Sequence, residues 1–369
     1  MKKIFLVTLL LLCCLKTPVF AQNSLPQAPK QEFLKGIVIQ VIEQGEKTAE
    51  GYKNYYQTLR VKLIDGTQKG KFTIIENGKD AQITKDQLVS KNQQIIVAKT
   101  IYPKGQITYS IYDYYRLNSL IIFIVIFFIA VLLIAGLKGL GSSLGMLVSL
   151  GIILLYIIPN ILKGNDPLTI TLIGSVFILS ITTYLAHGVS KKTTVALVST
   201  LTSLLLTAGF AIAAVKFNNI TGLGNEDSFA LSLGPTNVIN IRGLFLSGVI
   251  ISTLGALNDI TTTQSATILE LKIANPKLKF MALFEKGLII GKEHIASLVN
   301  TLILAYVGSS FAVFIFLVLN PAHLPYWVIF NNEIVSDEII KIITGSIGLL
   351  LSVPIVTLLA SYIFSKTKN

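Results

Sequence analysis

Seven long apolar runs occupy the chain after Asn118, and they restrict the fold more than any other feature of the sequence. A helix crosses the roughly 30 Å hydrocarbon core of a bilayer with about 20 apolar residues, because hydrocarbon offers no partner to unpaired backbone groups. Charged residues make up only 14% of the chain, whereas soluble domains contain roughly 25%. The sequence therefore predicts a mainly α-helical membrane protein with about seven transmembrane helices. The predicted spans are residues 118–136, 140–158, 168–187, 194–215, 243–258, 294–319 and 339–364.

The N-terminus has the pattern of an export signal. Lys2 and Lys3 precede a twelve-residue apolar run, and Ala21 ends a permissible cleavage site. The run is too short to span a bilayer, which takes about 20 residues, and it has the length of a signal-peptide core. We expect residues 1–21 to be a cleaved signal peptide, with an uncleaved anchor as the alternative, and residues 22–34 to be a linker.

Residues 35–113 alternate with a period of two, and turn residues separate the segments. Segments rich in Val, Ile, Thr and Tyr, with turn pairs such as Asn77 and Gly78 between them, are typical of short β-strands. They predict a small exported β-rich domain, either an OB-like barrel or a sandwich, which we interpret as a spacer or partner-docking module. The predicted strands are residues 36–42, 57–64, 71–76, 94–99 and 106–112.

Aromatic residues mark two predicted membrane interfaces. Tyr114, Tyr115 and Arg116 immediately precede the first span, and Trp327 lies in the segment 320–335 between the last two spans. Amphipathic rings favour the headgroup layer, where the ring is buried and the polar tip stays hydrated. We therefore interpret these four residues as interfacial anchors.

The basic residues are distributed unevenly about the spans. If the β-rich domain is exported, ten lysines lie on the cytoplasmic side and four basic residues lie near the outer ends, as the positive-inside rule requires. The formal net charge of +12 does not indicate nucleic-acid binding, because these cations lie between apolar runs and not on one accessible face. We expect a cytoplasmic C-terminus. The ten lysines are Lys138, Lys191, Lys192, Lys272, Lys277, Lys279, Lys286, Lys292, Lys366 and Lys368, and the outer four are Lys163, Lys216, Arg242 and Lys341.

The sequence offers little for metal or covalent chemistry. Cys13 and Cys14 both lie in the N-terminal apolar run, and the three histidines have no metal-ligand spacing. A Walker A motif is also absent from the sequence. We expect no metal site, no cofactor and no enzymatic activity.

Small residues at helical spacing predict close helix packing, because two backbones can approach where no side chain separates them. Gly248, Ser252 and Gly255 form such a stripe in the fifth span, and Gly308 belongs to a similar stripe in the sixth. The stripe of the fifth span ends at Asp259, one turn further along the same face.

Polar residues gather where the fifth span ends and the sixth begins. Between the two spans, residues 260–271 are predicted to continue as an amphipathic helix that breaks near Asn275 and Pro276. A carboxylate at a span end is costly unless it is paired, hydrated or bound to a cation, so Asp259 marks a candidate polar or transport site. The alternative is structural: Asp259 would cap a helix beginning at Ile260 and pair with Lys292 or His294. The candidate residues are Asp259, Thr263, Gln264, Lys292, Glu293, His294, Asn300 and Thr301.

Two segments of the chain resemble the signature of the YibE/F-like membrane proteins: residues 255–266 and residues 291–302, the latter followed by Ala305 to Gly308. Where an acidic pair is expected, this chain has Asn258 before Asp259, and this weakens a divalent-cation site that needs both carboxylates. Where Arg-Asp is expected before the histidine, it has Lys292 and Glu293, which keep the charges. The resemblance implies a multi-pass protein of the bacterial cell membrane, and it names no activity.

Three functions remain open from the sequence. The leading hypothesis is a transporter, or the membrane subunit of one, with its polar site near the cytoplasmic side of spans five and six. The second is a non-catalytic envelope sensor or scaffold that docks a membrane or envelope protein through its exported domain. The third is an intramembrane enzyme with Asp259 and His294 as an acid–base pair, which no motif supports. The lipid bilayer is the one partner that all three require.

Overall fold

The computed structural model describes residues 30–49, 52–79, 82–103, 105–234 and 239–366. The chain divides into two compact units, residues 1–126 and residues 127–369. The predicted signal peptide lies outside the described residues. Of the predicted linker, residues 30–34 are described, and they belong to the first strand.

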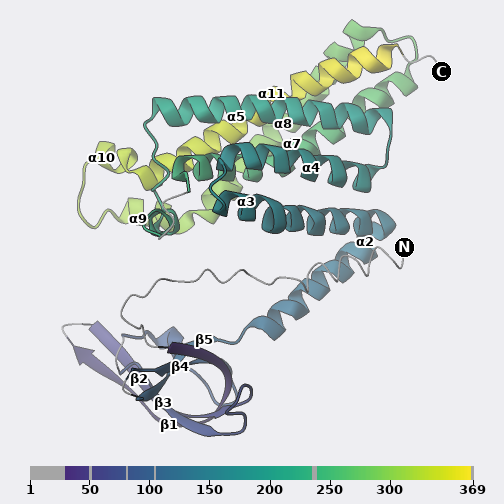
Figure 1. Cartoon of the computed structure of the whole chain (residues 1–369). Coiled ribbons are helices and arrows are strands. Elements are labelled where there is room, and N and C mark those ends of the chain that lie inside the picture. Colours follow the sequence, from purple (N-terminus) through teal and green to yellow (C-terminus); the bar gives the residue numbers. More distant parts are fainter. Residues whose placement is uncertain (1–29, 50–51, 80–81, 104, 235–238, 367–369) are drawn as a thin grey trace. The chain divides into compact units, whose positions relative to one another are not determined.

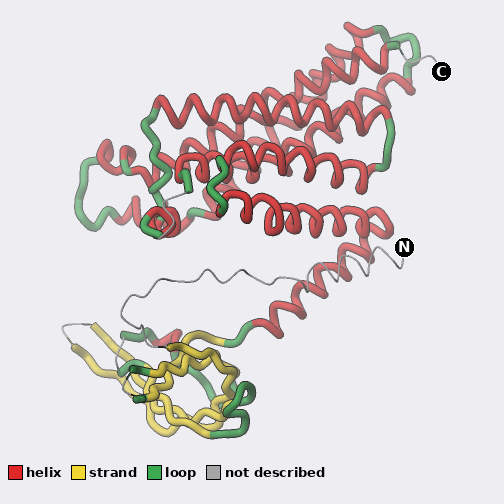
Figure 2. Tube along the Cα trace, in the orientation of Figure 1, coloured by secondary structure: helices red, strands yellow, loops and turns green. Residues whose placement is uncertain are grey.

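The first unit contains a five-stranded antiparallel sheet with the order β3-β2-β1-β4-β5 (Figure 1). The edge strands β3 and β5 approach each other, so the sheet curls into a small barrel (Figure 2). A five-stranded, partly open barrel is the architecture of an OB-like fold, and the predicted β-rich domain is confirmed. The strands are β1 (Lys30–Ala49), β2 (Tyr52–Leu63), β3 (Phe72–Asn77), β4 (Gln94–Ile101) and β5 (Ile107–Tyr114).

Period-two alternation builds the core of this barrel. On β2, Leu59 and Val61 are fully buried, while Arg60 and Lys62 between and after them are exposed. Strand β1 is long enough to pair with both β2 and β4, and register shifts after Val38 bend it between the two partners. Such bulges increase twist and allow a sheet to close.

The second unit is helical, and Figure 2 shows it as a bundle of long, roughly aligned helices. Together with the start of α2 in the first unit, it supplies seven stretches long and apolar enough to cross a membrane among the described residues. This confirms the predicted fold class. The helices are α2 (Leu117–Ile152), α3 (Ile158–Leu162), α4 (Pro167–His187), α5 (Lys191–Phe217), α6 (Glu226–Ser232), α7 (Ile241–Ala274), α8 (Phe280–Ser309), α9 (Phe311–Leu319), α10 (Tyr326–Asn331) and α11 (Glu333–Ser365), with a π-helical turn (Ile153–Ile157) before α3.

A glycine separates the first two membrane-spanning stretches. Gly136, within α2, has φ +58° and ψ −141°, a conformation that side chains strongly disfavour. The break divides the apolar sequence into Leu117–Gly136 and Gly139–Leu162, each long enough to span.

The fifth and sixth helices differ from the predicted spans 243–258 and 294–319. Helix α7 continues through the polar segment after Asn258 to Ala274, and α8 already begins at Phe280. The hydroxyls of Thr261 and Thr262 donate to carbonyl oxygens of the preceding turn, so these polar residues stay helical. With 34 residues, α7 is about 51 Å long and exceeds the bilayer core.

Helix α11 lies at the centre of the helical unit and packs against α5, α7 and α8. Its buried face combines apolar residues, such as Val353 and Val356, with glycines and hydroxyl residues. The α7–α8 turn lies beside the C-terminal end of α11 (Figure 1), and the α4–α5 turn lies against the C-terminal part of α7. We call this end of the unit the lysine-rich end.

Candidate functional site

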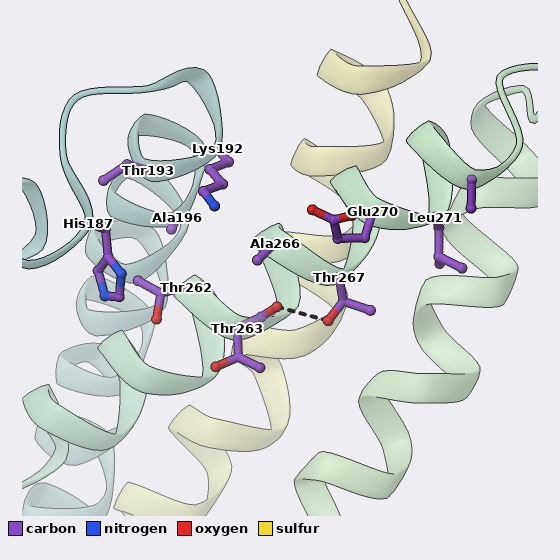
Figure 3. Close-up of a pocket in the computed structure, with 11 residues that line it drawn as sticks. His187, Lys192, Thr193, Ala196, Thr262, Thr263, Ala266, Thr267, Glu270 and Leu271 are labelled. Carbon is purple, nitrogen blue, oxygen red and sulfur yellow. Dashed lines mark hydrogen bonds between the residues drawn. The ribbon is translucent and has the colours of Figure 1, made fainter. Parts of the chain in front are cut away.

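A cavity of about 620 Å³ opens at the lysine-rich end between α4, α5 and α7 (Figure 3). His187, Lys192 and Glu270 supply its ionisable groups, and threonines and alanines supply most of the remaining wall. We call it the first cavity. Its lining residues are His187, Lys192, Thr193, Ala196, Thr262, Thr263, Ala266, Thr267, Glu270, Leu271 and Ala274.

The tight turn between α4 and α5 positions His187 and Lys192. Helix α4 ends at His187 because Gly188 follows with φ +71°, a conformation that glycine adopts without strain. Ser190 then caps α5 by accepting a hydrogen bond from the backbone N–H of Thr193 at 3.2 Å. The imidazole and the ammonium group therefore reach the cavity from two helices joined by a short turn.

Helix α7 forms the opposite wall with residues that share one helical face. Thr267 donates its hydroxyl hydrogen bond to the carbonyl oxygen of Thr263 at 2.9 Å, drawn as the dashed line in Figure 3. That hydroxyl therefore has its donor engaged within the helix and can offer the cavity only its acceptor lone pairs. Lys192 and Glu270 extend into the cavity from opposite walls (Figure 3), and among the residues that the structure describes neither forms an ion pair.

A second cavity, of about 530 Å³, lies between the second half of α2, α4 and α7. Asn258 and Asp259 line it from α7, and Ser142, Ser149 and Thr182 add hydroxyl-bearing side chains. His187 lines this second cavity as well as the first. His187 therefore lies where the two cavities adjoin, and Asp259 lines the second of them.

Comparison with known proteins connects this arrangement to a family. The family described as YibE/F-like protein matches residues 123–366. The chain belongs to the YibE/F-like family. Curated protein sequences and solved structures gave no match. Both cavities of this YibE/F-like chain lie within the matched residues, whereas the β-barrel lies outside them.

The structure separates the predicted polar site of this YibE/F-like chain between α7, which carries Asp259, Thr263 and Gln264, and α8, which carries the other predicted residues. Asp259 and Thr263 each line a cavity, Asp259 the second and Thr263 the first. No residue of α8 belongs to the described lining of either cavity, so His294 does not line the second cavity with Asp259. The capping alternative is wrong, because Asp259 lies inside the continuous helix α7.

Gln264 points away from the cavities and joins three helices. Its side chain is fully buried, and its amide nitrogen donates to the carbonyl oxygen of Gly287 at 2.7 Å and to the hydroxyl of Thr357 at 2.9 Å. Gly291 makes room for it, since a Cβ there would lie 3.0 Å from that nitrogen. Gln264 therefore links α7 to α8 and α11.

The remaining predicted site residues lie on α8. Lys292, Glu293, Asn300 and Thr301 are exposed on the unit, and Thr301 donates its hydroxyl to the carbonyl oxygen of Ser297. His294 is half-buried, and its Nδ1 has no hydrogen-bond partner among the described residues.

The glycines of the predicted packing stripe do not mark close helix contacts. A Cβ added to Gly248, Gly255 or Gly308 would meet no atom within 4 Å. The Ser252 hydroxyl donates to the carbonyl oxygen of Val249 at 2.9 Å and lies 2.5 Å from the hydroxyl of Tyr306 on α8. Helix α7 instead buries the face that carries Val249, Thr253 and Leu257, because bulkier apolar groups gain more from burial. The close approaches occur at other glycines, Gly287 and Gly291 of α8 and Gly345 and Gly348 of α11.

The three predicted anchors beside the first span make polar contacts in the barrel unit. The Tyr114 hydroxyl donates to the carbonyl oxygens of Asp86 and Leu88, at 3.1 and 3.2 Å. Arg116 pairs with Asp113 at 2.8 Å and, with the backbone N–H of Tyr114, holds the pKa of that carboxyl below its ordinary value. Tyr115 contacts Lys35, and Trp327 is 70% exposed at the start of α10 in the helical unit.

His187 is the residue that sequence reasoning missed. Its signal was present, since it stands directly before the turn that carries Lys191 and Lys192. In the sequence, residue 187 stands out only as the last residue of the third predicted span and as one of three histidines without metal-ligand spacing. Which of the polar span ends lie together depends on the packing of α4 against α7, and residue spacing within one helix does not contain it.

Proposed function

We propose that this chain is a transporter, or the membrane subunit of one, and that its polar site is formed by the two cavities that His187 separates. The observation that carries the proposal is this shared histidine, with Asp259 in one cavity and Lys192 and Glu270 in the other. Ionisable groups that line the cavities of a membrane bundle are functional candidates by default. The function is a non-enzymatic one.

Histidine suits the position between the cavities. Its ordinary pKa lies near neutrality, so a small change of surroundings adds or removes a proton. Asp259 is the acidic residue of the second cavity, and Glu270 is that of the first. Proton transfer through His187 would couple the occupancy of one cavity to that of the other.

The orientation belongs to the same proposal. The lysine-rich end would be cytoplasmic, as the positive-inside rule favours, and the β-barrel, which follows the predicted signal peptide, would be exported. Both cavities lie at or near the α4–α5 turn and would be reached from the cytoplasm.

Full-length protein in proteoliposomes tests the proposal. Proton flux under an imposed membrane potential and uptake of a panel of ions and small solutes would be measured for the wild type and for His187→Ala and Asp259→Asn. His294→Ala is the matched control, because it removes the same side chain outside both cavities. We expect flux that the two cavity variants abolish and the control retains. A wild type that moves neither protons nor any solute of the panel, or flux unaffected by His187→Ala, would refute the proposal.

A second function, a non-catalytic envelope protein that docks a partner through the exported domain, is favoured by one observation. The barrel has its own hydrophobic core and lies outside the residues matched by the family, as a separate module would. Replacing residues 30–113 by an unrelated barrel separates the two functions. Full retention of the cellular phenotype by that chimera would contradict the docking function and leave transport untouched.

A further inference from the structure

The outer face of β2 and β3 combines cations with large exposed apolar groups. Arg60 and Lys62 are exposed on β2, and Phe72 and Ile74 opposite them on β3 are 52% and 61% exposed. We call these four residues the basic face. They point outward because the alternate residues of β2, Leu59 and Val61, fill the barrel core.

The cations of the basic face are held by an aromatic ring. The Arg60 guanidinium carbon lies 4.9 Å and the Lys62 ammonium nitrogen 6.0 Å from the centre of the Phe72 ring. Neither cation forms an ion pair among the described residues, and the nearby Glu76 is engaged by Lys79. The charges therefore remain available to an external anion, and the two lysines of the following turn, Lys69 and Lys71, are exposed beside them.

The turn between β2 and β3 lies close to the start of the first span, within the same unit. Asp65 accepts the backbone N–H of Lys35 at 2.6 Å, and the Lys35 ammonium group lies 4.7 Å from the centre of the Tyr115 ring. Tyr115 is two residues before Leu117, where the first apolar stretch begins. One side chain thus connects this turn to the point at which the chain enters the bilayer.

We propose that the basic face docks on anionic phospholipid headgroups at the surface of the membrane that α2 enters. Phosphates complement Arg60 and Lys62, and a phenylalanine and an isoleucine beside them suit the boundary between headgroups and acyl chains. Basic residues beside a membrane anchor gain from the surface potential of an anionic leaflet, which acts over about a Debye length. The proposal does not depend on whether the chain transports a solute.

A tryptophan reporter tests this inference in the full-length chain. Trp327 is the single tryptophan, so Trp327→Phe provides a silent background in which Phe72→Trp is the only indole. The protein would be placed in nanodiscs of phosphatidylglycerol or of phosphatidylcholine, each with brominated acyl chains that quench nearby indoles. Phe33→Trp is the matched control, because Phe33 is 53% exposed on β1 outside the basic face.

We expect Phe72→Trp to be quenched in phosphatidylglycerol and much less in phosphatidylcholine. Arg60→Glu with Lys62→Glu, or high salt, should remove the difference, while Phe33→Trp should show none. Equal quenching in both lipids, or a difference that survives the double charge reversal, would overturn the proposal. Absence of quenching in phosphatidylglycerol would also overturn it and would favour a protein partner for the basic face. Circular dichroism of each variant checks that the barrel stays folded.

Discussion

Replacing Gly348 by alanine tests the packing at the centre of the bundle. A Cβ at this position would overlap Oγ1 of Thr207 on α5 and lie 3.1 Å from its Cγ2 and 3.2 Å from its Cβ. Thr207 cannot yield freely, because its side chain is fully buried and its hydroxyl donates to the carbonyl oxygen of Ser203 at 2.8 Å. The two helices must therefore separate, or the threonine must leave its rotamer.

The magnitude follows from a comparison with Gly248, where a Cβ would meet nothing within 4 Å. Both substitutions gain the same helix-propensity term of about 0.5–1 kcal/mol, so it cancels in the difference between the two variants. Overpacking of a well-packed interior costs about 1–3 kcal/mol. Gly348→Ala should therefore be less stable than Gly248→Ala by about 1–3 kcal/mol.

Equilibrium unfolding in mixed detergent micelles, with increasing sodium dodecyl sulfate, measures both variants. The double variant Gly348→Ala with Thr207→Ala supplies an internal check, because removing Oγ1 and Cγ2 restores space for the new methyl group. We expect it to recover part of the loss, a coupling of about 0.5–3 kcal/mol. The reasoning fails if Gly348→Ala and Gly248→Ala agree within about 0.5 kcal/mol, the usual error of additivity.

Three further changes test local structure. Asp166 caps α4, and the Thr169 backbone N–H and hydroxyl hold the pKa of its carboxyl below the ordinary 3.8. The carboxylate therefore contributes its full stabilisation above pH 3.8 and loses it as pH falls through the lower pKa of the folded protein. Asp166→Ala should lower the free energy of unfolding at neutral pH by at most about 1 kcal/mol, because the carboxyl is exposed, and should weaken the loss of that free energy at acid pH; an unchanged acid dependence contradicts it. Gln57→Leu should destabilise the barrel by about 2–4 kcal/mol, because the buried Val89 N–H and C=O each lose their partner, and hydrogen exchange at Val89 should accelerate; unchanged exchange contradicts it. Glu333→Ala should accelerate exchange at the Gly222 amide, which donates to Glu333 at 2.7 Å, and equal rates in both proteins would contradict that contact's role.

The helix ends show where apolar runs are a poor guide. The fifth apolar run ends at residue 258, and only the amphipathic pattern of residues 260–271 predicts that the helix continues, as α7 does to Ala274. The threonines of this segment bond to their own helix, and Gln264 finds partners on α8 and α11. A hydropathy pattern measures transfer into lipid, so it stops at polar residues even when a protein interior satisfies them. The barrel strands were easier, since alternation and turn residues are properties of the local sequence.

Only part of the candidate site could be predicted from the sequence, for a similar reason. Polarity in an apolar segment singled out Asp259 and Thr263, and both line cavities. The same criterion selected His294 and Gln264, which occupy other faces of their helices. Periodicity assigns residues to one face of one helix, but it cannot say which face another helix covers.

The sequence by itself determined which part of this protein lies in a bilayer and which part lies in water. Long apolar runs require helices across a bilayer, and alternation with turns requires a small sheet, because backbone groups must be paired in either medium. The motifs at residues 255–266 and 291–302 also sufficed to indicate the family, which the match over residues 123–366 confirms. Tertiary structure alone decided which span ends meet. Helix α7 turns its bulky face inward and leaves Gly248 and Gly255 outside, and this rotation places Asp259 in a cavity with His187. The rotation of α7 about its axis depends on its packing against α4, α5, α8 and α11 together, so no single segment of the sequence contains it.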